Sequence, residues 1–134
     1  MVGFEKLRVY VISEQLADDV WEFVQEWPIL ARDTVGKQLI RAVDSIGANI
    51  AEGTGRGSYK DNRRFVKIAR GSLYETRHWL RRAYKRGFLT EPQIKKLKSH
   101  LNELGPKLNA YLRSIGPTFP DSSSQNDQNE TNDK

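Results

Sequence analysis

The chain has 134 residues, no cysteine, and a net charge of +5 from 22 Lys and Arg against 17 Asp and Glu. This length fits one domain, and the absence of cysteine excludes disulfides and thiolate metal sites, which favours a reducing compartment and predicts a cytoplasmic protein. No apolar run approaches the ~20 residues of a membrane span and no signal peptide is recognisable, so no membrane partner is expected.

The charge is unevenly distributed along the chain. Residues 1–116 contain 21 basic and 13 acidic residues, a net +8, whereas 117–134 contain four acids and one lysine. The last segment is rich in Ser, Asn, Asp and Gln, so burial cannot offset the entropy lost on ordering it. We predict a domain over 1–116 and a disordered acidic tail over 117–134. A solvated tail is favoured over a flap that competes for the basic surface.

Apolar residues of the first predicted helix recur at steps of three and four from Val9 to Trp27, and Pro28 ends the helix. Phe4 and Leu7 fall off this stripe. We therefore expect the first residues to lie across the end of the helices, where their side chains close the core.

A second helix is expected to begin at Asp33 or Thr34, because either side chain can cap a helix. Its apolar positions are Val35, Leu39, Val43, Ile46 and Ile50. Gly53 is expected to end it.

Two capping patterns mark the starts of the remaining helices. Ser58, with an acid three residues later, opens a third helix that runs to Gly87. Thr90 opens a fourth helix in the same way, and Pro106 inside that helix should bend it. No segment alternates with a period of two, so no strand is predicted. Four helices with short connections predict an all-α, up-down-up-down antiparallel four-helix bundle with a short N-terminal extension.

The third helix carries the most unusual charge pattern, because residues 56–86 contain eleven Lys or Arg and two acids. With 100° between residues, most of these cations share one side of the helix. The predicted nucleic-acid-binding residues are Lys60, Arg63, Arg64, Lys67, Arg70, Tyr74, Arg77, His78, Arg81, Arg82 and Lys85. The predicted buried side consists of Phe65, Ile68, Ala69, Ser72, Thr76, Trp79, Leu80 and Ala83.

A cationic surface with an embedded ring suits RNA or DNA, because arginines hold phosphates while a base stacks on Tyr74. A solvated helix face usually mixes charges of both signs, which disfavours that simpler interpretation. A membrane surface ranks lower because no exposed bulky apolar group accompanies the charges. The hypothesis is non-specific binding of RNA or DNA. The alternative is a scaffold whose basic surface docks a partner protein.

The segment between the second and third helices, SIGANIAEGTGR at 45–56, is rich in glycine. Glycine permits positive φ and close backbone approach, so the segment predicts a tight turn in which Glu52 pairs with Arg56. A phosphate cradle is the alternative, but no GKS or GKT follows, which excludes a Walker loop.

Catalytic motifs are sparse. Glu75-x-x-His78 matches one element of the di-iron carboxylate motif, which requires two such elements and two further Glu facing inward. With two histidines, no cysteine and no nucleophile elbow, no catalytic triad can be assembled. We expect no enzymatic activity, no metal and no cofactor.

The motifs SIxxNIAEGxGR and GSLxET, at 45–56 and 71–76, resemble the bacterial four-helix-bundle proteins encoded by reading frames in intervening sequences of 23S ribosomal RNA genes. Phe4-x-x-Leu7 and Gln38-Leu39-x-Arg41-Ala42 are similar to the same family, and the resemblance covers residues 4–115. It implies a small helical bundle that assembles as a homopentamer, with no established enzymatic activity.

The resemblance also has implications for partners. These proteins are similar in architecture to the accessory variability proteins of diversity-generating retroelements, which bind nucleic acid and a reverse transcriptase. An accessory role beside a reverse transcriptase is therefore implied. The motif positions taken as architectural, as a structural turn and its contacts, are Asn49, Glu52, Gly53, Gly55, Arg56, Ser72 and Glu75.

Overall fold

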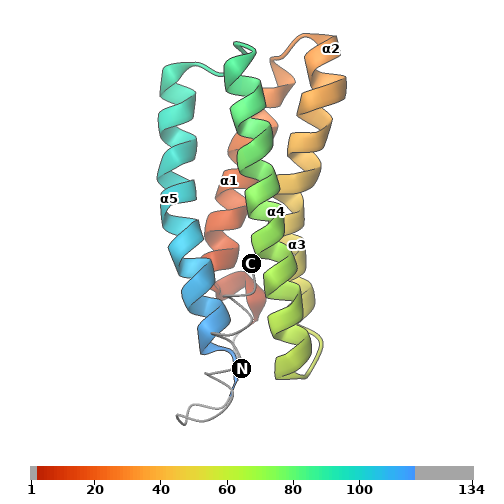
Figure 1. Ribbon diagram of the computed structural model, residues 1–134, viewed down its shortest axis with the longest axis vertical. Coiled ribbons are helices and arrows are strands. Elements are labelled where there is room, and N and C mark those ends of the chain that lie inside the picture. The colour runs from red at the N-terminus through yellow and green to blue at the C-terminus, as the bar shows by residue number, and fades with distance from the viewer. Residues whose placement is uncertain (1–2, 117–134) are drawn as a thin grey trace.

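The computed structural model describes residues 3–116, which form helices and no strand. The four long helices are α1 (Arg8–Gln25), α3 (Lys37–Thr54), α4 (Tyr59–Lys85) and α5 (Glu91–Ser114). A short segment, η1 (Phe4–Lys6), precedes α1. Two further short segments, α2 (Ile29–Ala31) and η2 (Arg32–Gly36), precede α3. Figure 1 shows the long helices side by side along the longest axis. The predicted disordered tail at 117–134 lies outside the described residues.

Each long helix packs against two others: α1 and α4 both contact α3 and α5. The contacts between α4 and α5 run in opposite order along the two helices. Tyr84, near the end of α4, donates a hydrogen bond to Glu91 at the start of α5 (3.0 Å). Arg63, near the start of α4, donates to the carbonyl of Ile115, just beyond the end of α5 (3.0 Å).

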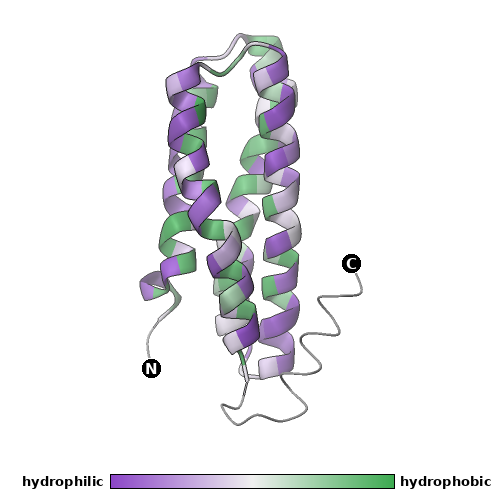
Figure 2. Cartoon of the chain, turned by 60° about the vertical axis from the view of Figure 1, so that its left-hand side comes forward, coloured by the Kyte–Doolittle hydropathy of each residue, from purple (hydrophilic) through white to green (hydrophobic). Residues whose placement is uncertain are grey.

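The core is formed by one aliphatic stripe from each long helix, and Figure 2 shows green apolar positions along the helices among purple polar ones. Leu16, Ile46, Val66, Leu104 and Leu108 lose all or nearly all of their exposed surface. Burying a side chain of this size stabilises the fold by about 1.5–3 kcal/mol relative to leaving it in water. Within residues 3–116, no helix has the length and apolar character needed to cross a membrane.

The predicted apolar stripe of the first helix is buried from Val9 onward, but α1 ends at Gln25, earlier than predicted, and Trp27 is buried just beyond its end. Leu7 packs against the core, and the half-buried ring of Phe4 meets the Tyr10 ring edge-on at 4.8 Å between centroids. The extension therefore contacts the end of the core mainly through Leu7.

The second helical segment begins earlier than predicted, and the proposed caps are wrong. Helical structure starts at Ile29, directly after Pro28, and continues through η2 into α3. Thr34 lies inside this segment, where its Oγ1 donates to the Leu30 carbonyl (2.7 Å). Pro28, which lies three residues beyond the end of α1, has a fixed φ that suits entry into a helix and directly precedes α2.

The predicted caps of α4 and α5 are confirmed. The Ser58 hydroxyl accepts a hydrogen bond from the Asp61 backbone N–H (3.1 Å), and Thr90 and Gln93 form a reciprocal capping box. Helix α5 contains Pro106, and Figures 1 and 2 show the helix changing direction about halfway along its length. This bend is the expected effect of a proline that supplies no backbone donor and crowds the preceding turn.

Candidate nucleic-acid interface

Helix α4 is rotated relative to the predicted arrangement. Val66 and Leu73 point into the core, whereas Ile68, predicted to be buried, is 43% exposed. Four other predicted positions, Ala69, Thr76, Leu80 and Ala83, are buried as expected. The rotation places one edge of the basic stripe at the contact line between α4 and α5, which we call the seam.

Three arginines at seven-residue spacing, Arg63, Arg70 and Arg77, reach across this seam, and we call them the seam arginines. Residues seven apart lie on nearly the same side of a helix, so all three face α5. Their acceptors are, in order, the Ile115 carbonyl (3.0 Å), Asn109 Oδ1 (3.2 Å) and the Leu101 carbonyl (3.4 Å). The seam arginines thus contribute to helix packing as well as to surface charge.

The predicted solvent-facing position of Arg70 is wrong, because this side chain is only 5% exposed. Its Nη1 donates to Asn109, but its Nε and Nη2 are buried without a hydrogen-bond partner among residues 3–116. A buried guanidinium with unused donors is costly and calls for an acceptor. Sequence reasoning missed the burial because it depends on the position of α5.

Four members of the stripe, Lys60, Arg64, Arg81 and Lys85, are exposed, and we call them the outer cations. Arg64 also pairs with Asp61 at 3.9 Å, and its guanidinium lies 4.5 Å from the Phe65 ring centroid. The Tyr74 ring, 57% exposed, and His78 lie at exposed positions of the same helix. Lys67 and Arg82 are half-buried. The accessible part of the predicted stripe therefore consists of the outer cations together with Tyr74, His78 and the exposed seam arginine Arg77.

Helix α5 adds a cation that the sequence analysis did not include. Lys98 lines a groove of about 330 Å³ together with Arg77 and Arg81, and Glu91 is the acid in its lining. Lys95 and Lys98 also line a shallower groove of about 390 Å³. The run Lys95-Lys96-x-Lys98 could have predicted this extension, because it lies in the first turns of α5, directly after the Thr90 cap and opposite the end of α4. The basic surface thus extends from α4 onto α5.

A second concavity lies farther along the seam, at the bend of α5. This seam pocket, about 360 Å³, is lined by Arg70, Leu73, Tyr74, Arg77, Gly105, Pro106 and Asn109. Two guanidinium groups and no carboxylate from residues 3–116 contribute to the lining. The pocket is therefore positively charged.

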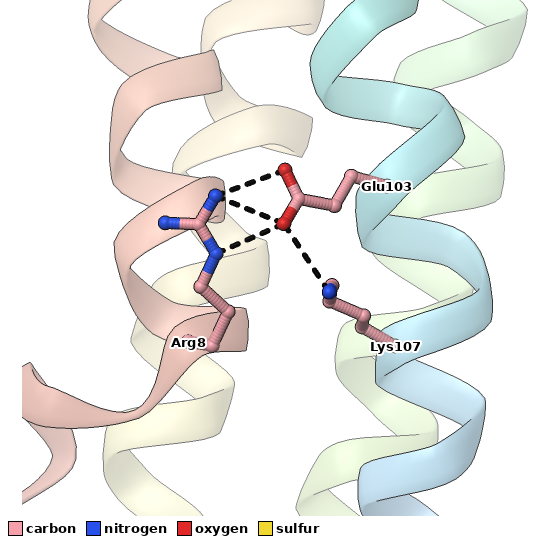
Figure 3. Close-up of polar contacts among 3 residues, drawn as sticks. All are labelled: Arg8, Glu103 and Lys107. Carbon is pink, nitrogen blue, oxygen red and sulfur yellow. Dashed lines mark hydrogen bonds and ion pairs between the residues drawn. The ribbon is translucent and has the colours of Figure 1, made fainter.

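At the contact between α1 and α5, two cations are paired with a carboxylate. Figure 3 shows Arg8 of α1 and Lys107 of α5 converging on Glu103. Arg8 Nε and Nη2 donate to Glu103 at 2.9 and 3.0 Å, and Lys107 lies 3.4 Å away. The hydrogen bond from Arg8 is the main cause of the lowered pKa of Glu103. The α1–α5 side therefore carries paired charges where the α4–α5 side carries an excess of cations.

Gly53, in the last turn of α3, allows α4 to approach closely. A Cβ atom on Gly53 would lie 2.5 Å from Asn62 Oδ1, so only glycine fits where the two helices approach. The predicted pair Glu52–Arg56 is present at 3.6 Å, and Arg56 lies 5.0 Å from the Phe65 ring centroid. The predicted end of this helix at Gly53 is wrong, because α3 continues to Thr54 and Gly55 is its C-cap residue.

Polar side chains connect the middle of the same two helices. Asn49 Nδ2 donates to the carbonyl and hydroxyl oxygens of Ser45 (2.8 and 2.9 Å), and Ser72 Oγ donates to Ser45 Oγ (3.0 Å). Glu75 instead stays on α4, where it accepts from Trp79 Nε1 (3.1 Å). These motif residues lie away from the seam pocket.

The Glu75-x-x-His78 element is not joined by further ligands. The His78 ring packs edge-on against Trp79, with 4.8 Å between centroids. Over the part of the chain that the structure describes, no three His, Cys, Asp or Glu side chains come together in a group that could hold a metal ion.

The geometry defines a class of small helical proteins with four long helices and a cationic groove on one helix pair. The family model for the 23S rRNA-intervening sequence protein matches residues 5–110, and the chain belongs to this family. A crystal structure of a protein with unknown function from the S23 ribosomal protein family of Bacteroides thetaiotaomicron is similar, with a TM-score of 0.69 and 22% identity over 79% of this chain and 99% of that chain. This likeness shows a shared fold. Comparison with curated proteins gives no match.

Proposed function

We propose that this protein is a non-enzymatic, cytoplasmic, homo-oligomeric helical protein that binds RNA or DNA through the α4–α5 face with little sequence specificity. The observation that carries the proposal is the exposure of the outer cations together with Lys98 beside a groove on the same face. The reversed order of contacts along the seam also supports an up-down-up-down antiparallel bundle, in which α4 and α5 are neighbours.

The length of the face suits an extended polyanion. Lys60 and Lys85 are separated by 25 residues of one helix, or ~37 Å at 1.5 Å per residue. Phosphates along one strand of B-DNA are ~3.4 Å apart, so the face has room for about ten nucleotides. Phosphate contacts confer affinity without reading sequence, which is the basis for expecting low specificity.

The exposed Tyr74 ring supplies a contact that duplex DNA cannot use, because paired bases are already stacked. Stacking of an unpaired base on a tyrosine contributes about 1–3 kcal/mol. A preference for single strands over duplex is therefore part of the proposal. The resemblance to retroelement accessory proteins supports a homopentamer and a reverse transcriptase partner, and five copies would multiply a modest single-site affinity.

The experiment is fluorescence anisotropy of labelled single-stranded RNA, single-stranded DNA and duplex DNA with the full chain, between ~50 and 200 mM salt. The test variant is Arg81→Glu with Lys85→Glu, and the matched control is Lys37→Glu with Arg41→Glu on exposed positions of α3. Affinity should fall log-linearly with salt, and the test variant should reduce the slope by about 2, since each phosphate contact contributes ~0.9.

Two results would contradict the proposal. One is the absence of binding at the lowest salt concentration. The other is an equal loss in the test and control variants, because this would show that net charge, and not the α4–α5 face, governs binding.

A scaffold for a partner protein is the second candidate, favoured by two neighbouring apolar residues in α2. Ile29 and Leu30 are 68% and 78% exposed, which is unusual for adjacent side chains of this size. Sedimentation of Ile29→Ser with Leu30→Ser tests this surface. Loss of self-association would assign it to contacts between copies, whereas an unchanged oligomer without nucleic-acid binding would favour docking of another protein.

A further inference from the structure

The seam pocket holds a group that neither helix packing nor the broad cationic face accounts for. Arg70 is 5% exposed, yet only its Nη1 has a hydrogen-bond partner, while Nε and Nη2 are buried without one among residues 3–116. A guanidinium presents its donors in a planar fork that matches two oxygens of a phosphate. The two unused donors, Nε and Nη2, lie on one edge of that fork.

The charge around Arg70 increases its demand for an anion. Arg77 lines the same pocket, and the lining contributed by residues 3–116 contains no Asp or Glu. The two acids of α4, Asp61 and Glu75, are engaged elsewhere, with Arg64 and Trp79. Two guanidinium groups in one pocket repel each other unless an anion lies between them.

The bend of α5 makes room for this arrangement. A Cβ atom at Gly105 would lie 3.1 Å from Arg77 Nη2, so the missing side chain leaves space for the guanidinium. Arg77 Nη2 also donates a hydrogen bond to the Leu101 carbonyl of α5 (3.4 Å). The space at Gly105 and this hydrogen bond therefore position the second cation of the pocket.

We propose that the seam pocket binds a phosphate group, supplied by a single-stranded nucleic acid, with Arg70 as the bidentate donor and Arg77 as the second cation. The nucleotide's base stacks on Tyr74, which lines the same pocket and is 57% exposed. This inference rests on the proposed function and adds one defined phosphate position to it. The two other large side chains of the lining, Tyr74 and Arg77, are exposed, and binding at Arg70 requires that side chains of the pocket change rotamer.

The first test follows the arginine side-chain Nε–H signals of the full, ¹⁵N-labelled chain by NMR during titration with inorganic phosphate and with adenosine 5′-monophosphate. Loss of a signal in Arg70→Lys assigns Arg70. We expect the Arg70 signal to shift with both ligands and the nucleotide to bind more tightly, a difference that Tyr74→Ala removes. An Arg70 signal that responds to neither ligand overturns the proposal.

The second test measures binding of a single-stranded oligonucleotide to Arg70→Met, Arg70→Lys and the control Arg41→Met, which removes the same charge from an exposed position of α3. We expect a loss of about tenfold or more for Arg70→Met, since bonds to charged groups are the strong ones, and a smaller loss for Arg70→Lys. The control should lose less than about twofold. Should Arg70→Met fail to fold, Arg70→Lys and the titration of the native chain still decide the question.

The outcomes separate this inference from the proposed function. Oligonucleotide binding that is equally affected in Arg70→Met and Arg41→Met would overturn the pocket and leave the cationic face standing. Absence of oligonucleotide binding would overturn the proposed function and, with it, the source of the phosphate. In that case a shift of the Arg70 signal with inorganic phosphate would still support a phosphate site, and no shift would overturn it.

Discussion

The two sides of the helical assembly differ in the sign of their charge. Helix α1 carries four acids and one base, whereas α4 carries nine bases and two acids. In the groove between α1 and α3, Asp18 and Asp44 are both among the lining residues, and burial together with the Asp18 charge raises the pKa of Asp44. Along the seam, in contrast, two guanidinium groups share one pocket.

This separation shows that net charge is a poor description of the surface. A polyanion is attracted to one side of the molecule and repelled by the other, so its approach is oriented before any contact forms. The same separation places like charges together within each side. Electrostatic repulsion between like charges is thus present on both sides: between two carboxylates in the α1–α3 groove, and between two guanidinium groups at the seam.

The largest effect is expected from reversing the outer cations, which would change the net charge of α4 from +7 (nine bases, two acids) to −1 (five bases, six acids). Replacing Lys60, Arg64, Arg81 and Lys85 by Glu should weaken single-strand binding at ~50 mM salt by at least about a hundredfold and flatten its salt dependence. Anisotropy titration measures both quantities, and circular dichroism verifies the helical content. Retained affinity would show that binding does not use this side.

A smaller effect is expected on stability when the two glycines that face α4, Gly53 of α3 and Gly105 of α5, are replaced by alanine. Gly53→Ala should lower the free energy of unfolding by ~1–3 kcal/mol, because the new methyl would lie 2.5 Å from Asn62 Oδ1 and 3.2 Å from the Asn62 backbone carbonyl oxygen. Gly105→Ala should cost less, since its neighbour is the movable end of Arg77 and alanine favours the helix by ~1 kcal/mol. Urea unfolding of both variants measures the difference, and equal losses would contradict it.

The pH dependence of stability in Asp44→Asn tests the repulsion between acids in the α1–α3 groove. Because folding raises the pKa of Asp44, its charged form destabilises the folded state, and this penalty is present above the folded pKa and disappears as pH falls below the unfolded value. The variant should therefore be more stable than the native chain at neutral pH, by no more than about 0.5 kcal/mol for so solvated a group. Thermal unfolding at neutral and acidic pH measures the gain, which should vanish in acid.

Glu103→Gln should show the opposite sign. The lowered pKa of Glu103 means that its charged form stabilises the folded state above the unfolded pKa, and this contribution is lost as pH falls through the folded pKa. The variant should be slightly less stable than the native chain at neutral pH and equal to it in acid. A gain in stability at neutral pH would contradict the role assigned to the Arg8 contact.

Much of the helical pattern could be predicted, because caps and apolar repeats are local signals. Ser58 and Thr90 marked the starts of α4 and α5 through bonds within one turn. The start of the second helical segment was missed because Asp33 resembled a cap while Pro28 already permitted a helix. Features that depend on a few neighbouring residues could thus be predicted. The exception is the second helical segment, where two start signals compete.

The candidate site was only partly predictable. The predicted buried face of α4 included the large side chains Phe65 and Trp79. In the structure the smaller Val66 and Leu73 face the core. The burial of Arg70 depends on Asn109, 39 residues away, and therefore on how α5 is placed. No local pattern contains that information, although the seven-residue spacing of the seam arginines was visible.

The same spacing has a consequence for how α5 can be aligned. Apolar side chains such as Leu104 and Leu108 pack through many weak, non-directional contacts, which tolerate a small displacement along the helix axis. The seam arginines end instead on three separate acceptors, and hydrogen bonds weaken steeply when distance or angle departs from the optimum. Sliding α5 by a single residue would strain all three at once. The seam arginines therefore add three directional contacts that help to select one register of α5 along its axis.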